Sequence, residues 1–324
     1  MLAGLDKLWK RLAQGLTPEQ AQKTLEEMTT ILWTGDPTQV AAAIREFLDS
    51  GHDAATGLPF RVGEKGLDFS PTMRVALLDL LERLDFGEAA EYAEILVARM
   101  EQPDEVAVAL RTLMHLPEDD PRRTLATTGV QRLLQRADWK ARPSGGYLEA
   151  FDVATETENP EIWRQLLALT ADTTAFDGTQ KGAALAAHTL AVRSPEFRAL
   201  ITKRDAALPM NPIIRGQLMA RLDPRVPEEL AALNAFVTDP AMTQEEAQAF
   251  AANFPSQRDL VGFRLVSDSL SKVRPIEEAA KLDIAANEFG RQLNSAVVTP
   301  QLRPLLTNFS KRLLQYADSA QKVR

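Results

Sequence analysis

The sequence predicts an all-α protein in which short helices follow one another in pairs. Three observations support this fold class: an N-capping residue stands directly before Pro ten times, apolar residues between these points fall at helical spacing, and long alternating runs typical of strands are absent. A capping side chain accepts a hydrogen bond from the first helical turn, and Pro at the first helical position lacks only a donor that the helix does not use. The ten dipeptides are Thr17-Pro18, Asp36-Pro37, Ser70-Pro71, Asp120-Pro121, Asn159-Pro160, Ser194-Pro195, Asn211-Pro212, Asp223-Pro224, Asp239-Pro240 and Thr299-Pro300.

Taken in order, the predicted helices recur at a regular interval. Helix starts near residues 71, 88, 103 and 121, and again near 160, 179, 195, 212, 227, 243 and 257, are about 15 to 19 residues apart. Two such helices make a unit of roughly 30 to 36 residues, which is the range of helical-hairpin solenoids.

A weak internal signature accompanies the interval. Pro-x-x-Arg recurs, with the Arg about one turn into its helix; the four cases are Pro71/Arg74, Pro195/Arg198, Pro212/Arg215 and Pro300/Arg303. With these features the chain resembles a degenerate HEAT-like α-solenoid, most clearly over residues 71–138 and 159–270. The resemblance is architectural and names no specific family; an irregular helical bundle is the alternative. Contacts between repeats and contacts with a ligand both remain open as roles for these arginines.

Two segments interrupt the pattern. Residues 51–69 contain four Gly and are expected to form a small β-hairpin from 58–62 and 66–69 around a turn at 63–66. Residues 141–146 read as a short flexible joint between an N-terminal helical block, 1–140, and a C-terminal block of repeats, 147–324. The same joint is compatible with a bend inside one continuous solenoid domain.

The 51–69 insertion is the first candidate binding region, because loops on a rigid scaffold often carry binding residues. A plug that covers the edge of the helical stack is the alternative interpretation. The candidate binding residues are His52, Asp53, Phe60, Arg61, Glu64, Lys65 and Asp68.

Composition excludes several kinds of site. The 324 residues include no Cys and three His, each alone in its segment, so no thiolate chemistry and no local His-based metal site is predicted. Nucleophile and phosphate-binding motifs are also missing from the sequence. We therefore predict no catalytic residues, no metal and no cofactor. The acids Glu118, Asp119 and Asp120 are not expected to bind a cation, because Asp120 is better explained as the N-cap before Pro121.

The charge balance argues against nucleic acid as the main partner. The formal net charge is −8, and residues 85–120 carry ten acidic and only two basic residues. A basic segment follows at 122–142, in which Arg122, Arg123, Arg132 and Arg136 form a candidate anion-binding patch. The acidic segment 85–120 and the basic segment 122–142 are equally compatible with ion pairing to one another, within one molecule or head to tail between two.

These features together favour a non-catalytic protein-interaction scaffold whose partner is another protein. One alternative is an enzyme with a carboxylate-based site that assembles only in three dimensions, and another is an anion-binding or nucleic-acid-binding module at 122–142. No membrane span is expected, because no run of about 18 apolar residues occurs. Without a signal segment the cytoplasm is the expected compartment; export is the alternative if the chain is a trimmed mature form.

Overall fold

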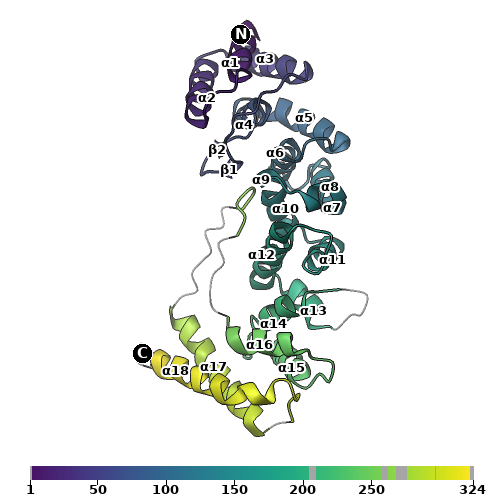
Figure 1. The fold of residues 1–324 in the computed structure, drawn as a ribbon, viewed down its shortest axis with the longest axis vertical. Coiled ribbons are helices and arrows are strands. Elements are labelled where there is room, and N and C mark those ends of the chain that lie inside the picture. Colours follow the sequence, from purple (N-terminus) through teal and green to yellow (C-terminus); the bar gives the residue numbers. More distant parts are fainter. Residues whose placement is uncertain (1, 204–208, 257–261, 268–275, 296, 322–324) are drawn as a thin grey trace. The chain divides into compact units, whose positions relative to one another are not determined.

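The computed structural model describes residues 2–203, 209–256, 262–267, 276–295 and 297–321. The chain divides into two compact units. Unit 1 is Met1–Thr157 together with Phe263–Asp268, and unit 2 is Glu158–Gly262 together with Ser269–Arg324. Both units are built mainly of helices, which confirms the all-α prediction (Figure 1). The predicted joint at 141–146 lies inside unit 1.

Unit 1 consists of ten helices and one small β-ribbon in its described residues. The strands β1 (Arg61–Val62) and β2 (Leu67–Phe69) pair antiparallel, which confirms a hairpin in the insertion with a shorter first strand than expected. The helices are α1 (Leu2–Leu12), α2 (Pro18–Trp33), α3 (Pro37–Asp49), α4 (Met73–Leu84), α5 (Phe86–Arg99), α6 (Pro103–Met114), α7 (Arg123–Gln135), α8 (Ala137–Ala141), α9 (Gly145–Glu149) and α10 (Phe151–Glu156).

Unit 2 contains the remaining helices, and aromatic side chains hold its C-terminal part together. The rings of Phe250, Phe254, Phe289 and Phe309 contact one another, and each of these residues is almost fully buried. The helices are α11 (Pro160–Leu169), α12 (Asp177–Arg193), α13 (Pro195–Thr202), α14 (Pro212–Met219), α15 (Pro227–Val237), α16 (Gln244–Asn253), α17 (Ile276–Ser295) and α18 (Leu306–Gln321), with a 3₁₀ turn at Arg303–Leu305.

Half of the ten predicted cap-Pro dipeptides begin a helix as expected. In each of the five the capping side chain accepts a backbone N–H of the first turn. The five capping residues are Thr17, Asp36, Asn159, Ser194 and Asn211.

At Ser70-Pro71 and Asp120-Pro121 the predicted helix start is wrong. The carbonyl oxygens of Ser70 and Pro71 accept hydrogen bonds from Thr56 of the insertion, so the chain stays extended and α4 begins later, with Thr72 as its cap. Asp120 accepts the N–H of Arg122 in a turn, and α7 begins only after that turn.

Three of the four arginines in the Pro-x-x-Arg signature form ion pairs with a Glu that lies 31 residues further along the chain. The N···O distances are 2.7 Å for Arg74 and Glu105, 2.7 Å for Arg198 and Glu229, and 3.2 Å for Arg215 and Glu246. In each pair the Arg lies in the first turn of one helix and the Glu in the first turn of the helix two further on: α4 and α6, α13 and α15, α14 and α16.

Two of these arginines also bond to the end of the preceding helix. Arg74 donates to the carbonyl oxygen of Leu48 in α3, and Arg198 donates to that of Ala191 in α12. One guanidinium therefore joins three helices, its own, the helix before it and the second helix after it, and its charge favours both the C-terminal carbonyls of one helix and the Glu at the start of another. The fourth arginine of the signature, Arg303, is exposed.

Candidate functional site

Three of the seven candidate residues of the insertion are held by contacts within unit 1. The ring of His52 is stacked on that of Trp9, with centroids 4.0 Å apart. The Asp53 carboxylate accepts the backbone N–H groups of Ala54 and Arg74. Phe60 is buried, and its Cβ lies so near α9 that a Cβ at Gly145 would be 2.8 Å from it. These three residues fasten the insertion to the helices.

The other four candidate residues lie on the exposed hairpin. Arg61 and Asp68 form a long ion pair of 3.7 Å across the two strands, and both side chains are more than half exposed. Glu64 and Lys65 are exposed in the turn between the strands. An exposed ion pair of this kind contributes little to stability. Because all four side chains are exposed, they are accessible for contacts with a partner.

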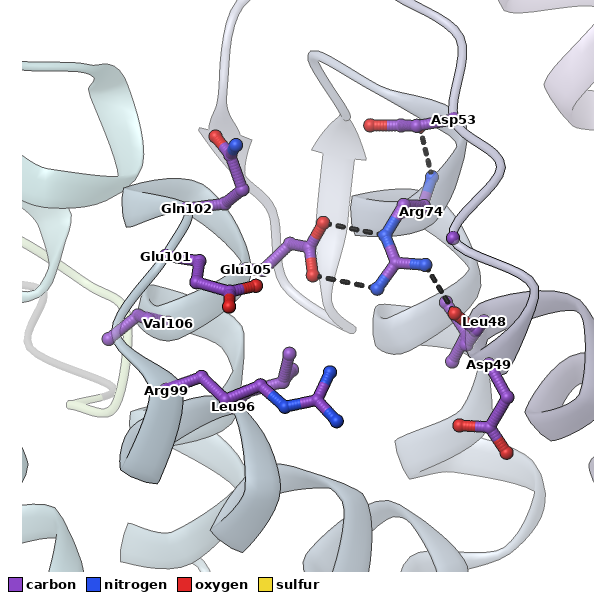
Figure 2. Close-up of a pocket in the computed structure, with 11 residues that line it drawn as sticks. Leu48, Asp49, Asp53, Arg74, Leu96, Arg99, Glu101, Gln102, Glu105 and Val106 are labelled. Carbon is purple, nitrogen blue, oxygen red and sulfur yellow. Dashed lines mark hydrogen bonds and ion pairs between the residues drawn. The ribbon is translucent and has the colours of Figure 1, made fainter.

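A polar cavity of about 360 Å³ lies beside the start of the insertion (Figure 2). Its base is the Arg74–Glu105 ion pair, whose donors and acceptors already bond to one another and to Leu48. Its rim carries Arg99 and Glu101, which are exposed. The groups at the base are engaged in holding helices together, and the rim has charges of both signs, so the cavity matches no single class of charged ligand.

The guanidinium groups of the basic segment are engaged within unit 1. Arg122 forms a bidentate pair with Asp120, and Arg136 does the same with Asp138. Arg132 donates to the carbonyl oxygens of Val97 and Ala98 at the end of α5. The fourth, Arg123, donates to the carbonyl oxygen of Leu116. Any anion at this patch would compete with these existing contacts.

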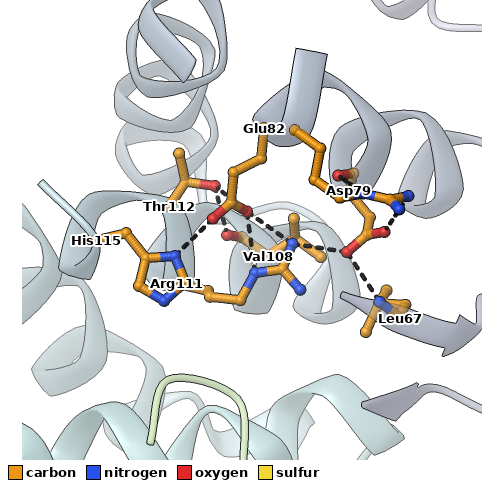
Figure 3. Close-up of polar contacts among 8 residues, drawn as sticks. Leu67, Asp79, Glu82, Val108, Arg111, Thr112 and His115 are labelled. Atoms are coloured by element: carbon orange, nitrogen blue, oxygen red, sulfur yellow. Dashed lines mark hydrogen bonds and ion pairs between the residues drawn. The ribbon is translucent and has the colours of Figure 1, made fainter. Parts of the chain in front are cut away.

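A buried charge cluster joins α4 to the second half of α6; we call it the Arg111 cluster (Figure 3). The guanidinium of Arg111 bonds to Asp79 at 2.8 Å and to Glu82 at 2.7 Å. Glu82 also accepts from Thr112 and contacts Nδ1 of His115 at 2.7 Å, while Asp79 accepts the N–H of Leu67 in β2. Burial raises the pKa of Glu82, but the hydrogen bond from His115 and the charge of Arg111 outweigh it and leave that pKa below its usual value.

A second pair of carboxylates lies on α9 and α10, the partly buried Glu149 and the buried Asp152; we call these two residues the carboxylate site. Ser144 caps α9 by accepting the N–H of Tyr147. The N–H of Gly146 donates to Asp104 of α6 at 2.8 Å, and a Cβ at Gly146 would lie 2.5 Å from the same oxygen. Glycine is therefore required for α9 to approach α6 this closely.

The carboxylate site binds an extended segment of the same chain, residues 263–267, which we call the strap. Oδ2 of Asp152 accepts the backbone N–H groups of Val266 and Ser267, both at 2.8 Å, and Oδ1 accepts the Ser267 hydroxyl at 2.9 Å. Oε2 of Glu149 accepts the N–H of Arg264 at 3.2 Å. The strap is 114 to 115 residues away from these acids along the chain and is visible as a short loop beside α9 (Figure 1).

Apolar contacts complete the docking of the strap. The ring of Phe263 meets that of Phe151 edge-on, with centroids 6.0 Å apart, and Leu265 is 2% exposed. Burying one such leucine contributes about 1.5–3 kcal/mol. The strap is therefore held as peptide ligands are held, by main-chain hydrogen bonds and by alternate side chains in apolar surroundings.

The carboxylate site differs from the Arg111 cluster in its titration. Burial raises the pKa of Asp152, and the hydrogen bonds from Ser267 and Val266 offset this only in part. Burial also raises the pKa of Glu149. The charge of Arg264 lowers the pKa of Glu149 in part, but among the described residues neither acid has an ion pair like that of Arg111 and Glu82, so both acids depend on the donors of the strap.

Glu149 and Asp152 were not among the residues predicted from sequence. A partial signal exists, because Asp152 lies between Phe151 and Val153 in a helix whose other residues are mostly apolar, and a buried acid needs donors. Nothing in the sequence indicates that those donors come from residues 263–267.

Comparison of the chain with protein-family models, with curated proteins and with solved structures finds no match. Among the described residues, no group of three or more His, Asp or Glu is placed to hold a metal ion. None of the helices in the described ranges combines the length and apolar character needed to cross a lipid bilayer.

Proposed function

We propose that the protein is a non-catalytic scaffold of the HEAT-like α-solenoid type that binds extended segments of other proteins. The observation that supports this function best is the strap itself, because unit 1 already holds five residues of extended backbone on the carboxylate site. A surface that binds one extended segment has the donors, acceptors and apolar contacts to bind another of similar chemistry.

The repeated ion pairs support the solenoid part of the proposal. The same Arg-to-Glu spacing of 31 residues occurs once in unit 1 and twice in unit 2, each time between a helix and the second helix after it. A spacing that equals one helical hairpin is the expected result when successive hairpins stack in the same way. An irregular bundle gives no reason for the spacing to recur.

The enzyme alternative has its nearest match in the same two acids. Asp152 is buried and Glu149 partly buried, and both have raised pKa values, as carboxylates in active sites often do. In this chain three backbone N–H groups and a hydroxyl donate to three of their four oxygens, while Phe263 packs on Phe151 and Leu265 is buried. This arrangement favours peptide binding over acid–base chemistry.

The proposed function is tested by selecting a phage-displayed library of random peptides on the intact protein. We expect enriched sequences that bind the wild-type chain, and we expect the double variant Glu149→Gln, Asp152→Asn to lose at least tenfold in affinity for them. The matched control is Glu118→Gln, which changes an exposed acid of the same unit. Enrichment of no sequence on the intact chain or on a chain whose strap is weakened by Leu265→Ser and Val266→Pro, or binding that the double variant leaves unchanged, would contradict the proposal.

A further inference from the structure

We infer that the strap is a built-in competitor of the carboxylate site: it occupies the site in cis, and the site's partner is an extended peptide carrying an aromatic, an aliphatic and a hydroxyl residue at alternate positions. This inference rests on the proposed function and adds the class of ligand and its regulation.

The class of ligand follows from what the site contacts. The positions of the strap whose side chains are used are Phe263, Leu265 and Ser267, which alternate along the segment. The side chains of Arg264 and Val266 lie between them; both residues donate a backbone N–H to one of the two acids, and the charge of Arg264 also interacts favourably with Glu149. A ligand is therefore specified mainly at every second residue, and the side chains between are less constrained.

The acids of the site impose a further requirement. Asp152 is buried and Glu149 is partly buried, and neither forms an ion pair among the described residues, so both need hydrogen-bond donors. The strap gives them three main-chain N–H groups and one hydroxyl. A ligand with Asp or Glu in place of Ser267 would set like charges against Asp152, and Pro in place of Val266 would remove a donor. Peptides with those residues are excluded.

The strap suits the role of competitor because it is short and belongs to the same chain. A tethered segment acts at an effective concentration on the order of millimolar when its linkers are short. Only molecules whose site is not filled by the strap can bind a free peptide, so its apparent affinity is reduced in proportion to that open fraction. An intact chain is therefore expected to bind such a peptide weakly until the strap is weakened.

The experiment uses a fluorescein-labelled hexapeptide with the sequence of residues 262–267, Gly-Phe-Arg-Leu-Val-Ser, and measures fluorescence polarisation on full-length protein. A strap-weakened chain carries Leu265→Ser and Val266→Pro, which remove the buried side chain and one donor. A site variant adds Asp152→Asn to the same background. A control peptide carries Asp in place of its Leu, and circular dichroism monitors the helical content of each chain.

The expected result is that the strap-weakened chain binds the hexapeptide at least tenfold more tightly than the intact chain. Adding Asp152→Asn should reduce that affinity at least tenfold, and the control peptide should bind no chain. Affinities for the intact and strap-weakened chains that agree within twofold would overturn the inference, as would binding that Asp152→Asn leaves unchanged.

Two further outcomes separate this inference from the proposed function. Library peptides could bind the carboxylate site of the intact chain as tightly as that of the strap-weakened chain. This result would support the proposed peptide-binding function and overturn the inference that the strap competes with the peptide. Light scattering on the intact chain tests whether the site is filled by the strap of a second copy. A dimer that becomes a monomer in the strap-weakened chain would mean that straps are exchanged between copies. That result would overturn the inference that the strap acts in cis and that the partner is a different protein. A library that yields no binder for either chain would contradict the proposed function itself.

Discussion

Unit 1 contains two groups of buried or partly buried carboxylates that are stabilised in different ways. In the Arg111 cluster a guanidinium lies between Asp79 and Glu82, and all three groups come from two helices that pack directly together. At the carboxylate site Glu149 and Asp152 have backbone N–H groups as donors, and these come from a strap more than 100 residues away in the chain. The pKa of Glu82 is lowered, whereas the pKa values of Glu149 and Asp152 are raised.

The difference separates a structural group from the proposed binding site. The hydrogen-bonding capacity of an acid paired with a cation of the fold is used within the fold, so the acid holds helices together and has few free acceptors for a ligand. A buried acid without an ion pair requires hydrogen-bond donors from another segment, and a segment that supplies them can dock there. A raised or lowered pKa by itself does not decide between these roles; the origin of the donors does.

The largest effect is expected from breaking the Arg111 cluster. Arg111→Met removes the guanidinium that Asp79 and Glu82 share and leaves Asp79 with Arg83 and Glu82 with His115, which should lower the free energy of unfolding by about 3 kcal/mol. Urea unfolding followed by circular dichroism measures the change. Arg99→Gln, at an exposed position, should change it by less than about 0.5 kcal/mol. A loss below about 1 kcal/mol for Arg111→Met would show that the cluster is not the structural group described above.

His188 in unit 2, which is partly buried, shows how burial changes the pKa of a basic side chain. Burial, together with the charge of Arg221, lowers the pKa of His188 to about 4, and its ring accepts from Arg221 through Nδ1. Because the unfolded chain takes up this proton near pH 6.5 and the folded chain only near pH 4, stability should fall as the pH falls between these values, by about 2 kcal/mol. His188→Gln should remove that part of the pH dependence, as measured by urea unfolding at a series of pH values. If the wild-type chain and His188→Gln show the same dependence of stability on pH, the lowered pKa of His188 does not contribute to stability as expected.

Releasing the strap should have a moderate effect that leaves the fold intact. Ser267→Glu sets a carboxylate beside Asp152, and we expect tryptic cleavage after Arg264 to accelerate about tenfold while the circular dichroism spectrum stays unchanged. Ser267→Thr keeps the hydroxyl and should retain the slow cleavage. Equal cleavage rates in all three chains would mean that the contacts of Ser267 do not hold the strap.

The smallest effect is a difference in sign between the two sites on acidification. The raised pKa values of Glu149 and Asp152 mean that the ionised acids lower the stability of unit 1, and that this loss is relieved as the pH falls through them toward the ordinary values of 4.5 and 3.8, with the charge of Glu156 adding to the shift at Asp152 and that of Arg264 opposing the shift at Glu149. Hydrogen exchange of the amides of α9 and α10, corrected for intrinsic rates, should slow a few-fold between pH 6.5 and 4.5.

The Arg111 cluster should respond in the opposite direction. Because the pKa of Glu82 is lowered, its contribution to stability is complete above the ordinary value of 4.5 and is lost as the pH falls below it. Amides of α4 and α6 should therefore lose protection below pH 4.5 while those of α9 and α10 keep theirs. Parallel pH profiles at the two sites would contradict the distinction between them.

The sequence predicted the local features of the fold well and the long-range ones poorly. Capping by Thr17 or Asn159 depends on a few neighbouring residues, and so does the hairpin of the insertion, so spacing and residue type were sufficient. The Pro-x-x-Arg signature was visible, but its role needed the Glu residues 31 positions away, which no local pattern connects to it.

The strap lay beyond such reasoning altogether. Its pairing with Asp152 spans 114 to 115 residues, and neither Phe263 nor Ser267 stands out in its own segment. The insertion carried more recognisable features, yet its residues His52, Asp53 and Phe60 are engaged in packing and backbone contacts. Unusual local composition thus indicated where the helical pattern breaks, and three-dimensional contacts indicated where a peptide is held.

The two Arg–Glu intervals of unit 2 overlap, from Arg198 to Glu229 and from Arg215 to Glu246. Residues 215–229 are therefore counted in both, and one residue added within a helix there turns everything after it by about 100°. Such a change would break both ion pairs at once, whereas the same insertion at 230–245 would break only one. A change of length within a helix of 215–229 is therefore expected to be less well tolerated than one in 198–214 or 230–245, because it affects both ion pairs.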